Sequence, residues 1–268
     1  VRSLTGNTRL LGNANTSTLD YYYPRNFVAP DGRIFGFDSH GKTYYVDTAG
    51  NGTITMSDQF GAQYAGQSGS AAMFRPGRIL QVAGYSNAAQ VIDITGGSPV
   101  MTPTQSVSSQ RQWVTTTILA DGQVLATGGS QNDTTEGTNA PINANRTAEI
   151  WNPTTGQWLQ GPAGARDRLY HSNAILLRDG SVLVAGGGAL NPPVGWPSQL
   201  NAEIYYPPYF FTAGGQRAPR PVIASAPDWV EIGSVLPVTV ANAASVSRVT
   251  LIKTSATTHS FNMDQRFL

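Results

Sequence analysis

The chain has 268 residues, enough for one large all-β domain or for a domain and a half. Charged residues make up 12% of it and the formal net charge is +1, so the composition indicates neither a basic face for nucleic acid nor an acidic tail. The absence of cysteine excludes disulfides, thiolate catalysis and cysteine-based zinc sites. No apolar run approaches the roughly 20 residues of a membrane-spanning helix. The 29 glycines and 17 prolines favour short strands joined by tight turns, and the many small polar residues favour a secreted protein.

The chain repeats one hairpin pattern four times. In each copy an apolar run, a tight turn and a second apolar run end in small residues. The copies are residues 26–38, 70–85, 114–130 and 172–188, and their turn glycines are Gly32, Gly77, Gly122 and Gly180. These glycines are separated by 45, 45 and 58 residues. Because Asp-Gly or Pro-Gly between alternating apolar runs is a strong hairpin signal, each copy predicts two antiparallel strands.

A weaker strand pair is expected after each hairpin, in KTYYVDTAGNGTITM, AAQVIDITGGSPVMTP, RTAEIWNPTTGQWLQGP and NAEIYYPPYFF. Four strands in each unit, with Gly-Gly after the second strand and a distal Trp158, are typical of a kelch-type β-propeller blade. An ordinary β-sandwich is the alternative, and the fixed period argues against it. Residues 131–146 explain the longer third step, because they have no apolar period and predict a surface loop. The first residues resemble the outermost strand of a preceding blade, so residues 1–217 are expected to hold about four blades of an incomplete all-β propeller.

The composition changes after residue 217. Residues 218–268 begin with prolines and continue with β-branched alternation in VLPVTV and SRVTLIKT. This pattern predicts the opening strands of an immunoglobulin-like sandwich, a fold that needs about 100 residues. We therefore expect residues 218–268 to be only the N-terminal part of such a domain, and both ends of the chain to be cut.

Each repeat has a pair of residues at the entry to its first strand, eight and nine positions before the Asp or Pro of the turn. Since the innermost strands of a propeller run parallel to one another along its axis, these entries gather at one end. The pairs are Tyr22-Tyr23, Gln67-Ser68, Gln112-Trp113 and Tyr170-His171. Aromatic rings with a few polar groups suit a small-molecule pocket, and packing under loops is the alternative. We expect a substrate pocket shaped by Tyr22, Tyr23, Gln112 and Trp113.

One of only three histidines stands at such an entry. Adjacent residues of an extended strand point to opposite faces, but a bend would let Tyr170 and His171 reach one point. Imidazole nitrogen and phenolate oxygen are good ligands for Cu(II), and the remaining histidines are the candidates for a further ligand. His40, in the polar turn DSHGKT, is expected to be a solvated loop residue. His259, in TTHSFNMDQRF, would reach the channel if its hairpin inserts there.

Three stretches, RLYHSNAILLRDGSVLVAGGG, AEIYYPPYFF and TTHSFNMDQRF, together resemble the galactose oxidase and glyoxal oxidase family of copper radical oxidases. The stretch YYYPRNFVAPDGRIF is closer in style to the glyoxal oxidases. The resemblance covers nearly the whole chain. Its specific part is the Tyr-His pair at a strand entry with Thr-His-Ser-x-Asn-x-Asp-Gln-Arg downstream. It implies a seven-bladed propeller whose copper is bound by Tyr170, His171 and His259, with Tyr170 as the base toward a substrate hydroxyl. Arg25 is expected near the mouth, either contacting substrate oxygens or solvated.

The resemblance also implies a radical cofactor made of a tyrosine cross-linked to a cysteine. Since the chain has no cysteine, we expect this pair to lie upstream of Val1. The implied activity is oxidation of small aldehydes or primary alcohols, with O2 reduced to H2O2, by a secreted monomer that binds neither nucleic acid nor membranes. The alternative is a non-catalytic kelch propeller that binds carbohydrate, cell wall or protein. A binding module would have no reason to bring His171 and His259 to one point.

Overall fold

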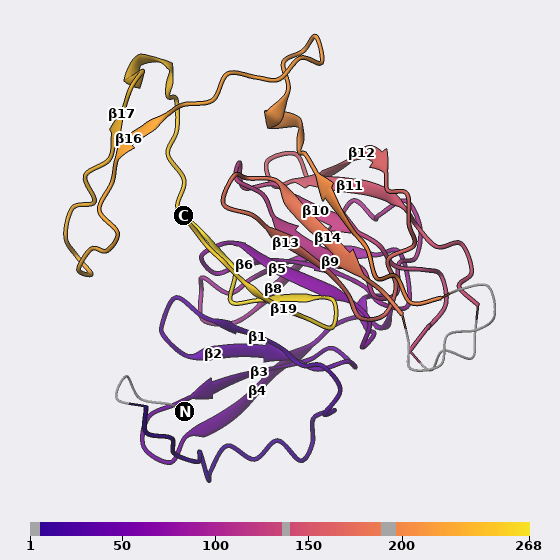
Figure 1. Ribbon diagram of the computed structural model, residues 1–268. Coiled ribbons are helices and arrows are strands. Elements are labelled where there is room, and N and C mark those ends of the chain that lie inside the picture. The colour runs from indigo at the N-terminus through magenta and orange to yellow at the C-terminus, as the bar shows by residue number, and fades with distance from the viewer. Residues whose placement is uncertain (1–5, 136–139, 189–196) are drawn as a thin grey trace.

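Strands account for most of the regular structure of the computed structural model, which describes residues 6–135, 140–188 and 197–268 (Figure 1). Four antiparallel sheets, called here blades 1 to 4, are meanders in which consecutive strands are neighbours. Blade 1 contains β1 (Arg25–Val28), β2 (Ile34–Phe37), β3 (Lys42–Asp47) and β4 (Thr53–Gln59). Blade 2 contains β5 (Ser70–Arg75), β6 (Arg78–Val82), β7 (Ala89–Asp93) and β8 (Val100–Thr104). Blade 3 contains β9 (Thr115–Ile118), β10 (Val124–Thr127), β11 (Thr147–Asn152) and β12 (Gln157–Ala163), and blade 4 contains β13 (Ser172–Leu176), β14 (Val182–Gly186) and β15 (Ala202–Tyr205).

The four predicted hairpins are confirmed as the first two strands of each blade. In three of the turns an aspartate accepts a hydrogen bond from the backbone N–H two residues later, as Asp31 does from Arg33. The following glycine takes a left-handed backbone, with φ of 86° at Gly32, which a side chain would oppose. Residue choice in the turns therefore accounts for the hairpins.

The weaker strand pair is found in blades 1 to 3, and blade 4 differs. Among the described residues only β15 follows β14 in its sheet. Pro207 and Pro208 come next and start the short 3-10 helix η2 (Pro208–Phe210). Proline has no N–H to donate to a strand ladder, so the expected second strand of NAEIYYPPYFF does not form.

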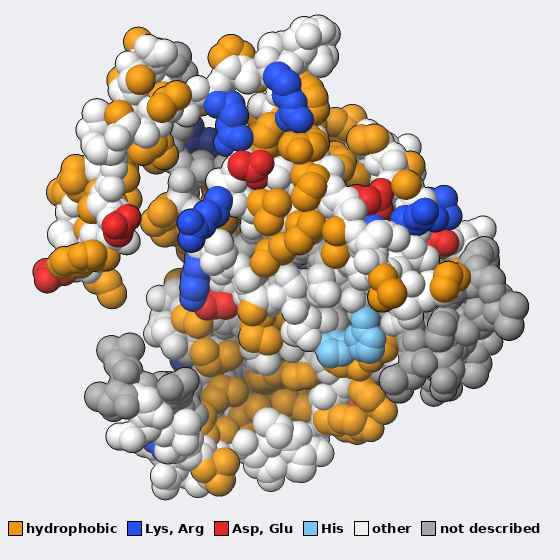
Figure 2. Space-filling view, in the orientation of Figure 1, with side chains coloured by type: hydrophobic (Ala, Val, Ile, Leu, Met, Phe, Trp, Pro, Cys, Tyr) orange, Lys and Arg blue, Asp and Glu red, His pale blue; other side chains and the backbone are white. Residues whose placement is uncertain are grey.

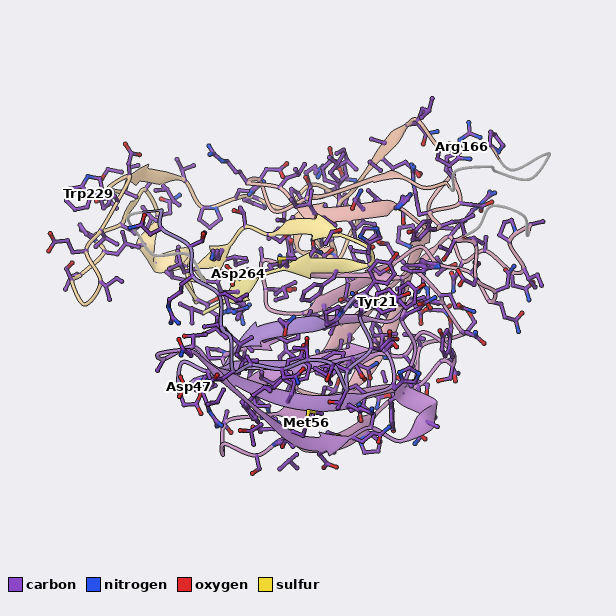
Figure 3. All side chains as sticks on the ribbon, turned by 90° about the horizontal axis from the view of Figure 1, so that it is seen from below. Tyr21, Asp47, Met56, Arg166, Trp229 and Asp264 are labelled. Carbon is purple, nitrogen blue, oxygen red and sulfur yellow. The ribbon has the colours of Figure 1, made fainter. Side chains whose placement is uncertain are left out.

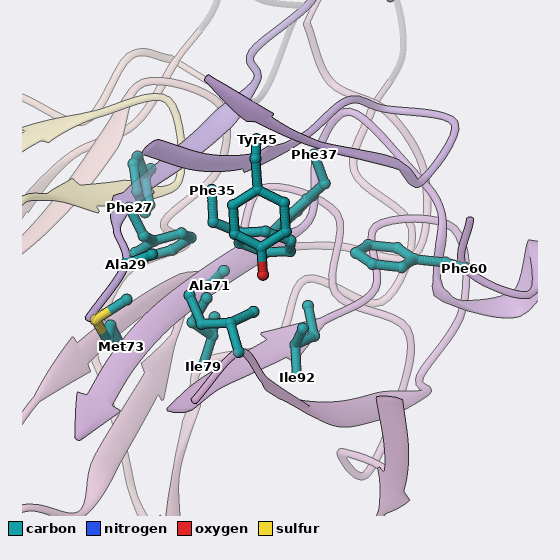
Figure 4. Packing of buried hydrophobic residues seen from close by; sticks show 12 residues of the cluster. Phe27, Ala29, Phe35, Phe37, Tyr45, Phe60, Ala71, Met73, Ile79 and Ile92 are labelled. Carbon is teal, nitrogen blue, oxygen red and sulfur yellow. The ribbon is translucent and has the colours of Figure 1, made fainter. Parts of the chain in front are cut away.

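The hydrophobic cores lie between neighbouring blades rather than within one blade. Blade 1 contributes Phe27, Phe35 and Tyr45 to the first of these cores, where they meet Met73 and Ile79 of blade 2 (Figure 4). The next residue of β6, Leu80, belongs to the core between blades 2 and 3. Because successive strand residues point to opposite faces, the inner strands of blades 2 and 3 are buried on both sides. This explains why the inner hairpins read as nearly continuous apolar runs.

Two ion pairs, one of them fully buried, connect the inner strand entries to the third strands of two blades. Arg111, just before β9, pairs with Glu149 of β11 at 2.6 Å, and both side chains are almost completely buried. Arg168, before β13, pairs with Glu203 of β15 at 2.7 Å. The Glu149 carboxylate also accepts hydrogen bonds from the backbone and hydroxyl of Ser108, so its charge is well compensated.

The tail after blade 4 forms three two-stranded sheets. They pair β16 (Ile223–Ser225) with β17 (Thr239–Val240), β18 (Ile252–Lys253) with β21 (Arg266–Phe267), and β19 (Ala256–Thr258) with β20 (Phe261–Met263). Figure 1 shows β16 and β17 away from the blades, whereas the yellow β19–β20 hairpin lies against them, as it also does in Figure 3. The short 3-10 helices η1 (Ala62–Tyr64) and η3 (Ala243–Ser245) complete the described elements. In the described parts of the chain, no helix has the length and apolarity needed to cross a membrane.

Candidate metal centre

The Tyr170-His171 pair lies directly before β13, where the backbone bends. His171 has φ of 63°, in the left-handed region, and the strand begins one residue later. This turn brings the two rings to the same side, with ring centroids 3.8 Å apart. The bend on which the sequence prediction depended is therefore present.

The β19–β20 hairpin carries His259 to the same place. His259 and Ser260 form the two-residue loop between its strands. The His259 ring centroid lies 5.3 Å from that of His171 and 5.8 Å from that of Tyr170. His259 thus meets the adjacent Tyr170 and His171, which lie far from it in the sequence, at the mouth of the blades. Figure 2 shows histidine side chains as one pale blue surface patch beside hydrophobic side chains.

Side chains on β20 and in the following turn hold the hairpin against the inner strand of blade 3. Asn262 donates from its amide to the backbone carbonyl of Thr116 at 2.8 Å and to the hydroxyl of Thr117 at 2.9 Å. The Gln265 amide binds both backbone groups of Ile118, accepting from its N–H at 2.9 Å and donating to its carbonyl at 3.0 Å. In the sequence these residues stand out only as part of the motif Thr-His-Ser-x-Asn-x-Asp-Gln-Arg. Their role was not visible, because β9 precedes them by more than a hundred residues.

Two further aromatic side chains complete the cluster. Tyr23 places its hydroxyl 3.1 Å from the hydroxyl of Tyr170, and its ring stacks on His259 with centroids 4.6 Å apart. Trp113 meets the rings of Tyr170 and Tyr23 edge-on, at 4.5 Å and 5.5 Å. The Trp113 indole N–H donates to Asp133 at 2.8 Å. Asp133 belongs to the inserted segment of blade 3, and sequence reasoning had given that segment no role at the site.

Residues at equivalent positions of three repeats have the same unusual left-handed backbone conformation in this cluster. Tyr23, Trp113 and His171 occupy the same position of their repeats, and their φ values are 47°, 65° and 63°. His259 has φ of 40°. Left-handed backbone is uncommon for residues with bulky side chains, and such strain concentrates at functional sites. The four residues therefore point to a site that the surrounding packing holds in place.

The protonation of the two central groups follows from their surroundings. Burial, and then the hydrogen bond with Tyr23, raise the pKa of the Tyr170 phenol. Burial, and then the positive charges of His171 and Arg25, lower the pKa of the His259 imidazole. The Nδ1 atom of His259 lies 2.6 Å from the Thr258 hydroxyl, so Nε2 is the ring nitrogen left to bind a metal. A neutral imidazole is the form that binds a metal.

The remaining candidate residues lie around this cluster. Tyr22 is 43% exposed beside Tyr23, with ring centroids 6.0 Å apart. Gln112 is buried, accepts a hydrogen bond from Ser68 at 3.2 Å and donates to the carbonyl of Gln131 at 3.2 Å. Arg25 is buried and donates to backbone carbonyls, and its contact with a substrate stays a prediction.

His40 is not part of the cluster. It lies in an exposed turn, with Nδ1 3.7 Å from a carboxylate oxygen of Asp20. Within the described ranges, no group of three or more His, Cys, Asp and Glu side chains could hold a metal ion. The donor set at the mouth is instead two imidazoles with phenol oxygens, a set that fits Cu(II).

Fold and site together define an all-β protein with propeller blades and a tyrosine–histidine cluster at their mouth, completed by a hairpin from the tail. Residues 220–268 match the family described as "Galactose oxidase-like, Early set domain". The chain is 30% identical over 179 residues to a galactose oxidase of Gibberella zeae, a match covering 65% of this chain and 25% of the relative. It is 30% identical over 188 residues to the aldehyde oxidase GLOX1 of Arabidopsis thaliana, covering 66% of this chain and 30% of that relative.

A solved structure supports the same fold. It is a fungal alcohol oxidase in complex with copper, which matches 92% of this chain and 53% of its own with a TM-score of 0.80 and 24% identity. These matches confirm the predicted resemblance to the galactose oxidase and glyoxal oxidase family. The predicted fold class, all-β propeller blades followed by the start of an immunoglobulin-like domain, is confirmed. The matched region is well under two thirds of the length of each of these curated relatives.

Proposed function

We propose that this chain provides the copper ligands of an oxidase that uses O2 to oxidise small aldehydes or primary alcohols and releases H2O2. The observation that carries the proposal is the meeting of Tyr170, His171 and His259 at the mouth of the blades. Tyr170 and His171 belong to blade 4, and His259 belongs to the tail hairpin, so two separate elements of the fold supply the site. The copper-bound alcohol oxidase of the same fold supports the choice of metal.

The residues present fit copper by their chemistry. His171 and His259 supply imidazole nitrogens, and Tyr170 supplies a phenol oxygen, all within ring-centroid separations of 3.8–5.8 Å. The Nδ1 contact with Thr258 leaves the far nitrogen of His259 for the metal. Bound copper would supply one-electron redox chemistry at this point.

The protein's own contribution to the reaction is to move a proton and to orient the substrate. A substrate hydroxyl placed beside Tyr170 would pass its proton to the Tyr170 oxygen in its ionised form, which a bound cation would favour. The Tyr23 hydroxyl lies within hydrogen-bond distance of that oxygen, at 3.1 Å. Removal of two electrons and two protons from a primary alcohol gives the aldehyde, and O2 takes them up as H2O2. Tyr22, Gln112 and Trp113 would shape the pocket that orients the substrate.

The family resemblance also implies a tyrosine–cysteine radical cofactor. This chain has no cysteine, so the cross-link cannot form from its own residues. We assign to this chain the copper ligands and the proton-accepting Tyr170. The proposal includes a secreted protein with O2 and a small molecule as its partners.

Copper titration tests the metal site, and the chain offers a matched control because it has only three histidines. We expect wild type to bind one Cu(II), and His171→Ala and His259→Ala each to weaken binding by about tenfold or more, since they remove a ligand. His40→Ala should leave the affinity unchanged. Calorimetry gives the affinities, and electron paramagnetic resonance of bound Cu(II) reports its nitrogen ligands. Equal affinities in all four proteins would refute the site and favour the non-catalytic binding module.

A substrate panel tests the reaction. With copper bound, the full-length protein should release H2O2 from small aldehydes or primary alcohols in the presence of O2, and Tyr170→Phe should slow turnover more than it weakens copper binding. Absence of peroxide across the panel, with copper shown to be bound, would count against oxidase activity.

A further inference from the structure

The turn that presents His259 is unfavourable for its own sequence. A two-residue hairpin loop of this kind needs left-handed backbone at both central positions, and Asn-Gly is the usual choice. Here the loop is His259-Ser260, with φ of 40° and 63°. Neither residue is glycine, so something outside the hairpin must stabilise this conformation.

Two donors from the blades bind the two carbonyls of this turn. The Arg25 guanidinium donates to the carbonyl of His259 at 3.0 Å. The Ser70 hydroxyl, at the start of β5, donates to the carbonyl of Ser260. Arg25 also donates to the carbonyl of Tyr23 at 2.8 Å and to that of Gly69 at 2.7 Å. Arg25 therefore binds the backbones of Tyr23 and His259, the two residues whose rings stack at 4.6 Å.

Arg25 differs from the other buried arginines in its partners. Arg111 and Arg168 each pair with a carboxylate, Glu149 and Glu203. Arg25 is 5% exposed, and among the described residues no carboxylate lies within ion-pair distance of it. Burial lowers the pKa of Arg25 to about 10, so it stays charged at neutral pH. A buried charge without a counter-ion is costly, which argues that its contacts with backbone carbonyls have a function.

We propose that Arg25 is a positioning residue, whose guanidinium holds the backbones of Tyr23 and His259 in their left-handed conformations and thereby sets where the two rings lie in the candidate metal centre. Ser70 secures the other half of the turn. The hydrogen bonds of Arg25 and Ser70 are present in the metal-free chain, so the positioning role does not require copper. Only the expected effect on copper binding rests on the proposed function.

The test uses the metal-free chain first. The stacked Tyr23 ring should shift the ring-proton resonances of His259 upfield, and the β19–β20 hairpin should protect its amides from hydrogen exchange. We expect Arg25→Met to remove the shift and to speed exchange in residues 256–263 by about tenfold or more. Arg33→Met, in an exposed ion pair of the same blade, is the matched control and should change neither.

A second substitution in the turn distinguishes a positioning role of Arg25 from a general loss of stability. Glycine takes the left-handed conformation without cost, so Ser260→Gly should restore part of the hairpin protection when added to Arg25→Met. If Arg25→Met does not fold, Arg25→Lys, which keeps the charge but lacks the guanidinium fork, and Ser70→Ala replace it. An unchanged His259 resonance and unchanged exchange in the folded variants would overturn the proposal.

The Cu(II) affinity of the same variants is the second measurement. We expect Arg25→Met to weaken Cu(II) binding by about tenfold or more although it removes no ligand, as loss of residues that orient ligands does. If wild type binds no copper, the proposed function fails, and the resonance and exchange data still decide whether Arg25 positions the hairpin.

Discussion

The imidazole of His259 lies close to the His171 ring and to the guanidinium of Arg25. The ring of His171 is 5.3 Å away, and Arg25 donates to the His259 carbonyl. Burial of His259 and these two charges all disfavour its protonated form, so its pKa falls below the ordinary value. The folded chain therefore holds this proton less tightly than the unfolded chain. It follows that the contribution of His259 to stability is present above about pH 6.5 and is lost as the pH falls below it.

Proton NMR can follow this residue directly, since the chain has three histidines. In the metal-free protein we expect the ring protons of His259 to titrate with a midpoint below about 6.5. His171→Gln should raise that midpoint, because it removes a positive charge that opposes protonation. His40→Gln should leave it unchanged. A His259 midpoint at or above the ordinary value would show that burial and neighbouring charges do not act as described.

Among the elements, the inner hairpins were predictable from their own residues, whereas the position of the tail hairpin was anticipated only through the family resemblance. The turns at Gly32 and Gly180 are specified by neighbouring residues, so the sequence showed them. The meeting of Tyr170, His171 and His259 was anticipated from the family resemblance, but the forces behind it were not. The His259-Ser260 turn depends on Arg25 and Ser70, which precede their partners by 234 and 190 residues. No local pattern reports such contacts.

The tail hairpin should depend strongly on Gln265. Its amide satisfies the N–H and carbonyl of Ile118, both on the buried inner strand of blade 3. Gln265→Ala leaves these two backbone groups without their partner, and we expect it to lower the free energy of unfolding by about 1–3 kcal/mol. Met263→Ala, on the exposed side of the same hairpin, should change it by less than about 0.5 kcal/mol. Urea denaturation measures both, and equal small effects would contradict this role of Gln265.

Across the whole molecule, blades are joined by cores that they share. Ile79 of β6 packs in the core between blades 1 and 2, and Leu80 packs in the core between blades 2 and 3. The tail takes part as well, because Phe261 lies in the first core and Phe267 packs against the second. The blades and the tail hairpin therefore stabilise one another, and the mouth where the site lies depends on all of them.

Ile79→Ala and Leu80→Ala test this sharing, since both side chains are fully buried and adjacent on one strand. Each should lower the free energy of unfolding by about 2–5 kcal/mol through lost burial and the cavity left behind. Val100→Ala, at an exposed position of β8, is the control and should cost less than about 0.5 kcal/mol. Because β6 belongs to both cores, we expect each buried variant to speed amide exchange in blades 1, 2 and 3 alike. Faster exchange confined to blades 1 and 2 in Ile79→Ala, and to blades 2 and 3 in Leu80→Ala, would mean that the blades open independently.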